Sequence, residues 1–446
     1  MLRRLQERVA PILRRIWRGV RWATPGQLDA GFASLATFTA GIFAVRELST
    51  VGLGGYALLF SAFTVMSQIP AELVFNPSQI LAVDLPVNQR LGMLAHSVPR
   101  GAVLAFLSSF AVPLGVLTIA AQIPTADLIS LSVSASLLAV VSPLQDHIRT
   151  ILHMAENSWV ASAMSATNFL TTLGTVLALS SIAAVWAPFG ALFLGNVLSL
   201  IVGGGWTLRR GVPAPVKPTF RELRWLGGWL LVTGISKTGL RYAITALLNV
   251  VAGVAALGYV EGARVVSQPI NVLAQGLMAQ VGPQITRAGA SKDRVMARRW
   301  GRRFAVILSL AAIPYTVLTA WPWAINPLAL IAPRAYVVPS LTAATLMVVL
   351  LAGFNRPQRM QLLGARHQKT VARTTIATGL LELGMIGTGI WIGAYAAPVA
   401  AGLATVATMV WFHRRLRIVY DTQVPGFQHP NDVAQPSPMV ADDDLP

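Results

Sequence analysis

The sequence predicts an all-α polytopic membrane protein with about twelve transmembrane helices in two halves of six. Three observations support this prediction: an unusually apolar composition, apolar stretches of bilayer length, and basic residues confined to alternate loops. Of the 446 residues, 54% are hydrophobic and only 12% are charged, and the mean hydropathy is +0.60. Soluble domains average about 25% charged residues, so a soluble fold does not account for this composition.

Apolar stretches long enough to cross a bilayer recur along the chain. A hydrocarbon core about 30 Å thick needs about 20 apolar residues per helix. The hardest stretch to divide is 248–283, because it contains Glu261 and Arg264. The expected spans are 27–46, 55–75, 101–122, 127–145, 158–183, 187–207, 225–249, 256–283, 304–323, 337–354, 372–392 and 394–412.

Basic residues indicate the orientation of these spans. All but five of the 35 lysines and arginines fall before the first span, in alternate loops, or after the last span. By the positive-inside rule that side faces the cytoplasm, so we expect a multi-pass protein of the cytoplasmic (inner) membrane with both termini cytoplasmic. The net charge of +18 is then a topology signal, and no nucleic-acid partner is expected. The five exceptions are Arg46, Arg334, Lys237, Arg241 and Arg264.

The chain divides into five parts. Residues 1–26 form a basic amphipathic segment, either an interfacial helix on an anionic leaflet or an ordinary basic tail. The first six spans form an N-terminal lobe, 27–207, and the last six a C-terminal lobe, 225–412. A cytoplasmic linker rich in proline and charge, 208–224, joins them, and a tail, 413–446, is expected to be largely disordered.

Several segments carry a resemblance to a known family. "GLGGYALLFSA" (52–62) and "AALGYVEGARV" (255–265) place Gly-Tyr at the start of the second and eighth spans. The first of these, the longer stretch 255–288, "QLLGARHQKTVARTT" (361–375) and "IGAYAAPVAAGLATVATMVWFHRRLR" (392–417) resemble bacterial oligosaccharide-lipid flippases of the Wzx type. Those flippases share a superfamily with the MATE multidrug exporters and with MurJ, which has two further helices that this chain lacks.

This resemblance implies two six-helix lobes around a central cavity that opens alternately to the two sides. The implied substrate is a polyprenyl-linked saccharide with an anionic phosphate or pyrophosphate, flipped to the outer leaflet for assembly of cell-envelope polysaccharide or glycan. Other implied partners are membrane lipids and polysaccharide synthases or a polymerase. A multidrug exporter of the same superfamily is the alternative within transport. From another class, a membrane glycosyltransferase or polymerase is the alternative, although we expect no enzyme and no catalytic residues.

Cations inside the spans are the candidate substrate-binding residues. A central Lys or Arg costs about 2.5 to 3.5 kcal/mol in a membrane helix, so such residues need a partner. Lys237 and Arg241 share one face of the seventh span, which contains no acid, and we expect them to bind the phosphate. Arg264 and Arg46 are expected to add to this lining. Two alternatives stay open: Arg46 and Glu47 lie at the outer interface, and Arg264 is neutralised by an acid three residues away.

Acidic residues within the spans are candidates for coupling to a driving ion. Glu382 lies in the middle of the eleventh span, Asp29 near the start of the first, and Glu261 in the eighth. A buried carboxylate can carry a proton or help to bind sodium, so a proton or sodium gradient or the membrane potential is the expected driving force. Alternatively, Glu382 is a static partner of the cations, and Asp29 favours a helix N-terminus. We expect no cofactor and no metal, since a Walker motif is absent and the histidine spacing in 146–156 is unsuited to a metal site.

Overall fold

The computed structural model describes residues 25–26, 28–82, 86–180, 184–210, 219–321, 326, 338–365 and 367–421. Within these residues the chain forms helices and no strand, which confirms the all-α prediction. Nine of the described helices are long and apolar enough to cross a membrane, and one of these contains two spans. Most of the basic N-terminal segment, 211–218 of the linker and 422–446 of the tail lie outside the described residues.

The N-terminal lobe begins with a helix over Leu28–Glu47, which continues into a second helix through a short turn at Ser49. The Ser49 hydroxyl accepts a hydrogen bond from the Gly52 amide at 3.1 Å, and so caps the second helix. The remaining elements of this lobe are α2 (Thr50–Pro70), η1 (Ala71–Phe75), α3 (Asn76–Ala82), α4 (Val87–Ser109), η2 (Val112–Gln122), α5 (Thr125–Met154), α6 (Ser158–Leu179) and α7 (Ala187–Arg210).

The C-terminal lobe is built around a long helix that turns back on itself. This helix, α8 (Phe220–Ala290), is interrupted at Gly253, where φ is +84° and ψ is 162°. Its two halves are the predicted seventh and eighth spans, and the break lies inside the stretch that hydropathy divides least clearly. The other elements are α9 (Arg294–Ala320), α10 (Pro339–Gly364), α11 (Gln368–Thr388), η5 (Gly389–Tyr395) and α12 (Ala396–Asp421).

The helices are longer than the predicted spans at their basic ends. The regions 284–303 and 355–373, which the sequence assigns to loops, are almost entirely helical, because α9 begins at Arg294 and α10 continues to Gly364. Likewise, α12 continues past the predicted end of the last span at 412, to Asp421. Arginine is a good helix former, so a helix can continue into water where the apolar stretch that defines the span has ended.

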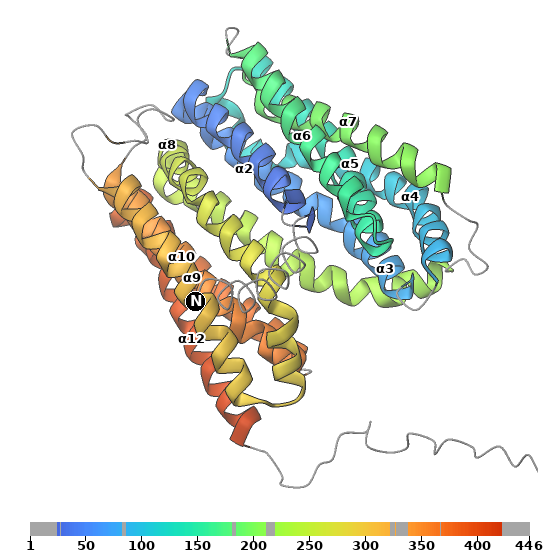
Figure 1. Ribbon diagram of the computed structural model, residues 1–446. Coiled ribbons are helices and arrows are strands. Elements are labelled where there is room, and N and C mark those ends of the chain that lie inside the picture. The colour runs from blue at the N-terminus through green and yellow to red at the C-terminus, as the bar shows by residue number, and fades with distance from the viewer. Residues whose placement is uncertain are drawn as a thin grey trace, which may run out of the picture.

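The two lobes meet at one end and diverge toward the other, with α8 in contact with helices of both (Figure 1). One apolar core crosses between the lobes beside Gly253 and includes Leu53, Val254 and Ala396. At the opposite end, where the basic residues lie, each lobe has a separate core. We call these two regions the outer closure, because the positive-inside rule predicts that this end faces outward, and the basic end. The protein is therefore joined at the outer closure and open toward the basic end.

Glycines allow the close approach of α2 and α8 at the outer closure. A Cβ at Gly54 would lie 2.3 Å from the Cγ2 atom of Val254, and a Cβ at Gly258 would lie 2.8 Å from the Thr50 carbonyl oxygen. In each contact, a glycine of one segment with the Gly-Tyr pattern, 52–62 or 255–265, lies against a residue just before the other segment. The pattern therefore marks the place where the second and eighth spans meet.

Candidate functional site

A row of polar side chains runs along one face of the second half of α8. Its members are three or four residues apart, so they lie above one another on the helix. At 1.5 Å per residue, the row is about 21 Å long. It starts just below the outer closure and runs toward the basic end. We call it the polar stripe, and it comprises Glu261, Arg264, Gln268, Asn271 and Gln275.

The upper end of the polar stripe is an ion pair. The Nε atom of Arg264 donates to the Oε2 atom of Glu261 at 2.7 Å, and its Nη2 atom contacts the other carboxylate oxygen. The guanidinium also lies 5.3 Å from the ring centroid of Phe60 on α2, which places a side chain of the N-terminal lobe against it. The structure thus shows the local neutralisation of Arg264 that the sequence left open as an alternative.

The other cations predicted for the site lie on the first half of α8 and at the end of the first span. Arg241 is exposed on the first half of α8 and interacts electrostatically with Arg264, Glu261 and the half-buried Glu382 of α11. Lys237 lies one turn before Arg241 on α8, but its side chain is outside the described residues. The side chain of Arg46 is 63% exposed at the end of the first span, and its Nε atom lies 3.4 Å from a carboxylate oxygen of its neighbour Glu47.

Below the ion pair, the polar stripe faces amides of the N-terminal lobe across a cavity of about 280 Å³, the inter-lobe cavity. Gln145 of α5, Asn168 of α6 and Asn196 of α7 line its opposite wall. The Asn168 amide donates to Asn196 at 2.8 Å, and Gln145 donates to the Ser199 hydroxyl at 3.1 Å. Such amides can both donate and accept hydrogen bonds. The cavity therefore presents neutral polar groups from both lobes.

A second cavity, of about 540 Å³, lies within the C-terminal lobe between α8, α10, α11 and α12. Gln275 borders this C-lobe cavity and also the inter-lobe cavity, so the polar stripe connects them. Arg356 and Arg359 of α10 line it, and a guanidinium nitrogen of Arg356 donates to the Asn271 side-chain oxygen at 2.5 Å. Hydropathy assigns both arginines to a loop, so neither is among the site residues predicted from the sequence. Their spacing of three residues next to an apolar span is the signal that could have revealed them.

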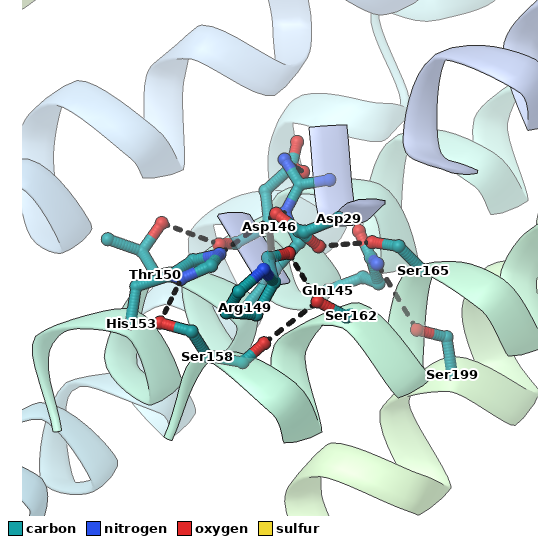
Figure 2. Close-up of polar contacts among 11 residues, drawn as sticks. Asp29, Gln145, Asp146, Arg149, Thr150, His153, Ser158, Ser162, Ser165 and Ser199 are labelled. Carbon is teal, nitrogen blue, oxygen red and sulfur yellow. Dashed lines mark hydrogen bonds and ion pairs between the residues drawn. The ribbon is translucent and has the colours of Figure 1, made fainter. Parts of the chain in front are cut away.

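Asp29 is at the centre of a polar cluster at the basic end of the N-terminal lobe (Figure 2). The buried carboxylate accepts a hydrogen bond from Ser165 at 2.6 Å and lies 2.9 Å from the Nε2 atom of His153. Arg149 lies 3.7 Å from the same carboxylate and 2.9 Å from Asp146, and these two residues line the inter-lobe cavity. Asp29 thus contacts two other helices, α5 and α6, which adds to the local role at a helix start that the sequence suggested.

Comparison with known proteins identifies the fold. No family model and no curated protein matches the sequence. Among solved structures, the inward-facing conformation of a multidrug resistance MATE family transporter of the MOP superfamily gives a TM-score of 0.67 at 13% identity, covering 88% of this chain and 96% of that chain. The outward-facing conformation of such a transporter gives a TM-score of 0.63 at 14% identity, covering 90% of this chain and 96% of that chain.

A third similar structure is a MOP superfamily transporter from Pyrococcus furiosus, described as having a reverse polarity of its binding pocket that suggests a different function. Its TM-score is 0.62 at 13% identity, and the match covers 90% of this chain and 95% of that chain. All three matches span nearly the whole of both chains. The chain therefore has the all-helical fold of the MATE transporters of the MOP superfamily.

Proposed function

We propose that the protein is an alternating-access transporter that flips a polyprenyl-(pyro)phosphate-linked saccharide from the cytoplasmic to the outer leaflet. The polar stripe is the observation that carries this proposal. A glycan with a charged phosphate cannot cross about 30 Å of hydrocarbon unaided. A stripe about 21 Å long, facing amides of the other lobe and open at the basic end, offers the hydrogen bonds that such a head group loses when it leaves water. The polyprenyl tail would remain in the lipid between the lobes.

The balance of charge in the two cavities favours an anionic head group. In the part of the chain that the structure describes, Asp146 of the inter-lobe cavity lies against Arg149, and no acid is among the residues that line the C-lobe cavity. That cavity instead contains Arg356 and Arg359, and Arg356 contacts the neutral Asn271. Arginine suits phosphate because its planar guanidinium forms charge-assisted hydrogen bonds.

A multidrug exporter is the second candidate, because two of the similar structures are described as multidrug resistance transporters. A cavity for organic cations would be expected to expose carboxylates. Here Glu261 is engaged by Arg264, and Glu382 lies within electrostatic range of Arg241. The superfamily member with a binding pocket of reverse polarity supports the idea that one fold can serve substrates of different charge.

We propose Asp29 and Glu382 as the groups that couple transport to an ion gradient. Asp29 is buried, and its carboxylate lies 2.9 Å from the Nε2 atom of His153. Arg149 contacts both Asp29 and the lining of the inter-lobe cavity. An anionic head group that attracts Arg149 would therefore weaken its interaction with Asp29, which connects the inter-lobe cavity to the proposed coupling group.

The test is flipping of a fluorescent polyprenyl-pyrophosphate glycan in proteoliposomes, measured by quenching of the label in the outer leaflet. The variant R356Q/R359Q should flip at least about 10-fold to 100-fold more slowly, since the loss of even one hydrogen bond to a charged group costs about 1.5 to 3 kcal/mol. K369Q/R373Q is the matched control, because it removes the same charge from two exposed positions of α11. It should flip the lipid at the wild-type rate.

Three results would contradict the proposal. Equal rates for wild type and R356Q/R359Q would remove the C-lobe cavity from the substrate path. Export of a hydrophobic cation by a wild-type protein that does not flip the lipid would establish the exporter instead. A lengthened glycan in the recovered lipid, detected by mass spectrometry, would indicate a glycosyltransferase or polymerase.

A further inference from the structure

A separate basic groove lies on the C-terminal lobe between α9, α10 and α12, with a volume of about 400 Å³. Arg294, Arg298 and Arg302 come from α9 and are spaced by four residues, so they share one face of that helix. His413 and Arg417 have the same spacing on α12 and line the same groove. Two helices thus direct basic side chains into one space at the basic end of the lobe.

The charges around this groove are mostly of one sign. The Nε atom of Arg417 donates to the Nε2 atom of His413 at 3.1 Å, so two basic side chains are hydrogen-bonded to each other. At the rim, Arg294 lies 3.7 Å from a carboxylate oxygen of Asp421. Arg294, Arg298 and Arg302 place like charges four residues apart on α9, which destabilises a helix. An anion bound between α9 and α12 would remove this repulsion.

The floor of the groove combines apolar rings with polar groups that are neutral. Phe304 and Phe354 line it, together with Gln358 and Gln361. The Oε1 atom of Gln358 is buried and has no hydrogen-bond partner in the described part of the chain. Tyr420 donates to Gln361 at 3.2 Å, and burial raises the pKa of this phenol, which keeps it neutral. A ligand that suits this floor has hydroxyl and apolar parts as well as negative charge.

The surface beside the groove changes from basic to apolar within about two helical turns. Arg298 and Arg302 also border a surface patch that ends in Val306 and Ile307, which are 49% and 46% exposed. On α12, Trp411 is exposed just above His413. Basic residues and tryptophan next to exposed aliphatic side chains are typical of the level of the lipid head groups. The groove therefore lies at that level.

We propose that this groove binds the head group of an anionic glycerophospholipid of the cytoplasmic leaflet. The phosphate would lie between the arginines of α9 and Arg417, where charge-assisted hydrogen bonds favour it. A glycerol hydroxyl would donate to Gln358, and the acyl chains would follow the exposed aliphatic side chains of α9. All three helices of the groove belong to one lobe, so the lipid can remain bound while the lobes move. Its effect is to stabilise the C-terminal lobe at the membrane surface.

The test is thermal unfolding of the full-length protein in detergent, titrated with phosphatidylglycerol, phosphatidylcholine or inorganic phosphate. Phosphatidylglycerol should raise the midpoint, and the other two should not. The groove variant R298Q/R417Q should need about tenfold more phosphatidylglycerol for the same effect, since each basic residue contributes about one order of magnitude or less. R287Q/R373Q is the matched control: it loses the same charge at exposed positions outside the groove, and it should behave as wild type.

Native mass spectrometry of the same proteins gives a second measurement. Wild type and the control should retain phosphatidylglycerol in preference to phosphatidylcholine, and R298Q/R417Q should lose this preference while keeping its lipid-free midpoint. Stabilisation by inorganic phosphate alone would indicate a site for small anions and overturn the proposal. If the groove variant and the control lost the preference for phosphatidylglycerol equally, the lipid would be held only by the general positive charge of the protein, and the proposal would be overturned. A preference for polyprenyl phosphate would make the groove a cargo site and also overturn it.

Discussion

Arg264 illustrates how a cation can be retained inside an apolar span. Its carboxylate partner lies one turn away on the same helix, and the ring of Phe60 covers the guanidinium. The spacing of three residues made this pair predictable from the sequence. The contact between Arg356 and Asn271 was not predictable in the same way, because 85 residues separate them and the arginine had been assigned to a loop.

Gly253 is the residue on which the division of α8 depends. Its φ of +84° with ψ of 162° belongs to a region that only glycine occupies readily. A Cβ at this position would meet no atom within 4 Å. Any cost of Gly253→Ala therefore comes from the backbone and not from a clash. We expect this substitution to destabilise the protein by about 1 to 3 kcal/mol, measured as the unfolding midpoint in detergent.

Gly276 supplies the control for this prediction. It lies in the second half of α8 and also has open space where a Cβ would be placed, but its backbone is helical. Gly276→Ala should leave stability unchanged or raise it by about 0.5 to 1 kcal/mol, because alanine favours a helix. If Gly253→Ala proved as stable as Gly276→Ala, the turn in α8 would not require the positive φ.

At the scale of whole helices, hydropathy was a reliable guide to where helices lie and a poor guide to where they end. Each predicted span falls on a helix, because apolar stretches of bilayer length have few alternatives to helix in a membrane. The basic ends were predicted too short, as α9 and α10 show. Outside the hydrocarbon a helix is limited by caps and helix propensity, and the Asp293 side chain that caps α9 lies eleven residues before the apolar stretch that starts at 304.

The contact between α2 and α8 at the outer closure leads to a prediction about conformation. A larger side chain at Gly54 or Gly258 would overlap with Val254 or Thr50 across the lobes. Gly54→Leu and Gly258→Leu should therefore destabilise the outer closure and shift the population toward a state that is open on the outer side. In that state the basic ends of the two lobes should be closer together.

Spin labels can measure this shift, because the sequence contains no cysteine that would compete for them. Cysteines introduced at the exposed positions Trp159, in the N-terminal lobe, and Ser291, in the C-terminal lobe, would report the separation at the basic end. The distance should become shorter in Gly54→Leu and Gly258→Leu. Gly174→Leu is the control, since a Cβ there meets open space on α6. An unchanged distance in both variants would mean that the outer closure does not control the opening of the basic end.

For the molecule as a whole, the sequence predicted the all-helical architecture, and within the spans it drew attention to charged residues and not to neutral ones. Charges inside spans are conspicuous because each is costly there, and Arg264 and Glu261 were found in this way. The amides Gln268, Asn271 and Gln275 attract no such notice one at a time. Their importance comes from their alignment with one another and from the N-terminal lobe that faces them, and the latter depends on tertiary structure.

The Asp29 cluster joins three helices beside the inter-lobe cavity and leads to a prediction about energy coupling. Asp29→Asn replaces the carboxylate beside His153 with an amide, which does not carry a proton on and off. The amide oxygen can still accept the hydrogen bond from Ser165. We expect lipid flipping without a gradient to persist, and the acceleration by an imposed proton gradient to fall to a ratio of about one.

The measurement is the flipping rate in proteoliposomes with and without a pH difference, repeated with a sodium gradient at equal pH. Glu156→Gln is the control, because Glu156 is exposed at the same end of the N-terminal lobe and its loss should leave the acceleration intact. If Asp29→Asn still responded to the pH difference and Glu382→Gln did not, the coupling group would lie in the C-terminal lobe near Arg241. Asp29 would then hold the first span against α5 and α6 without carrying the ion, since its contacts to Ser165 and His153 join those helices in either case.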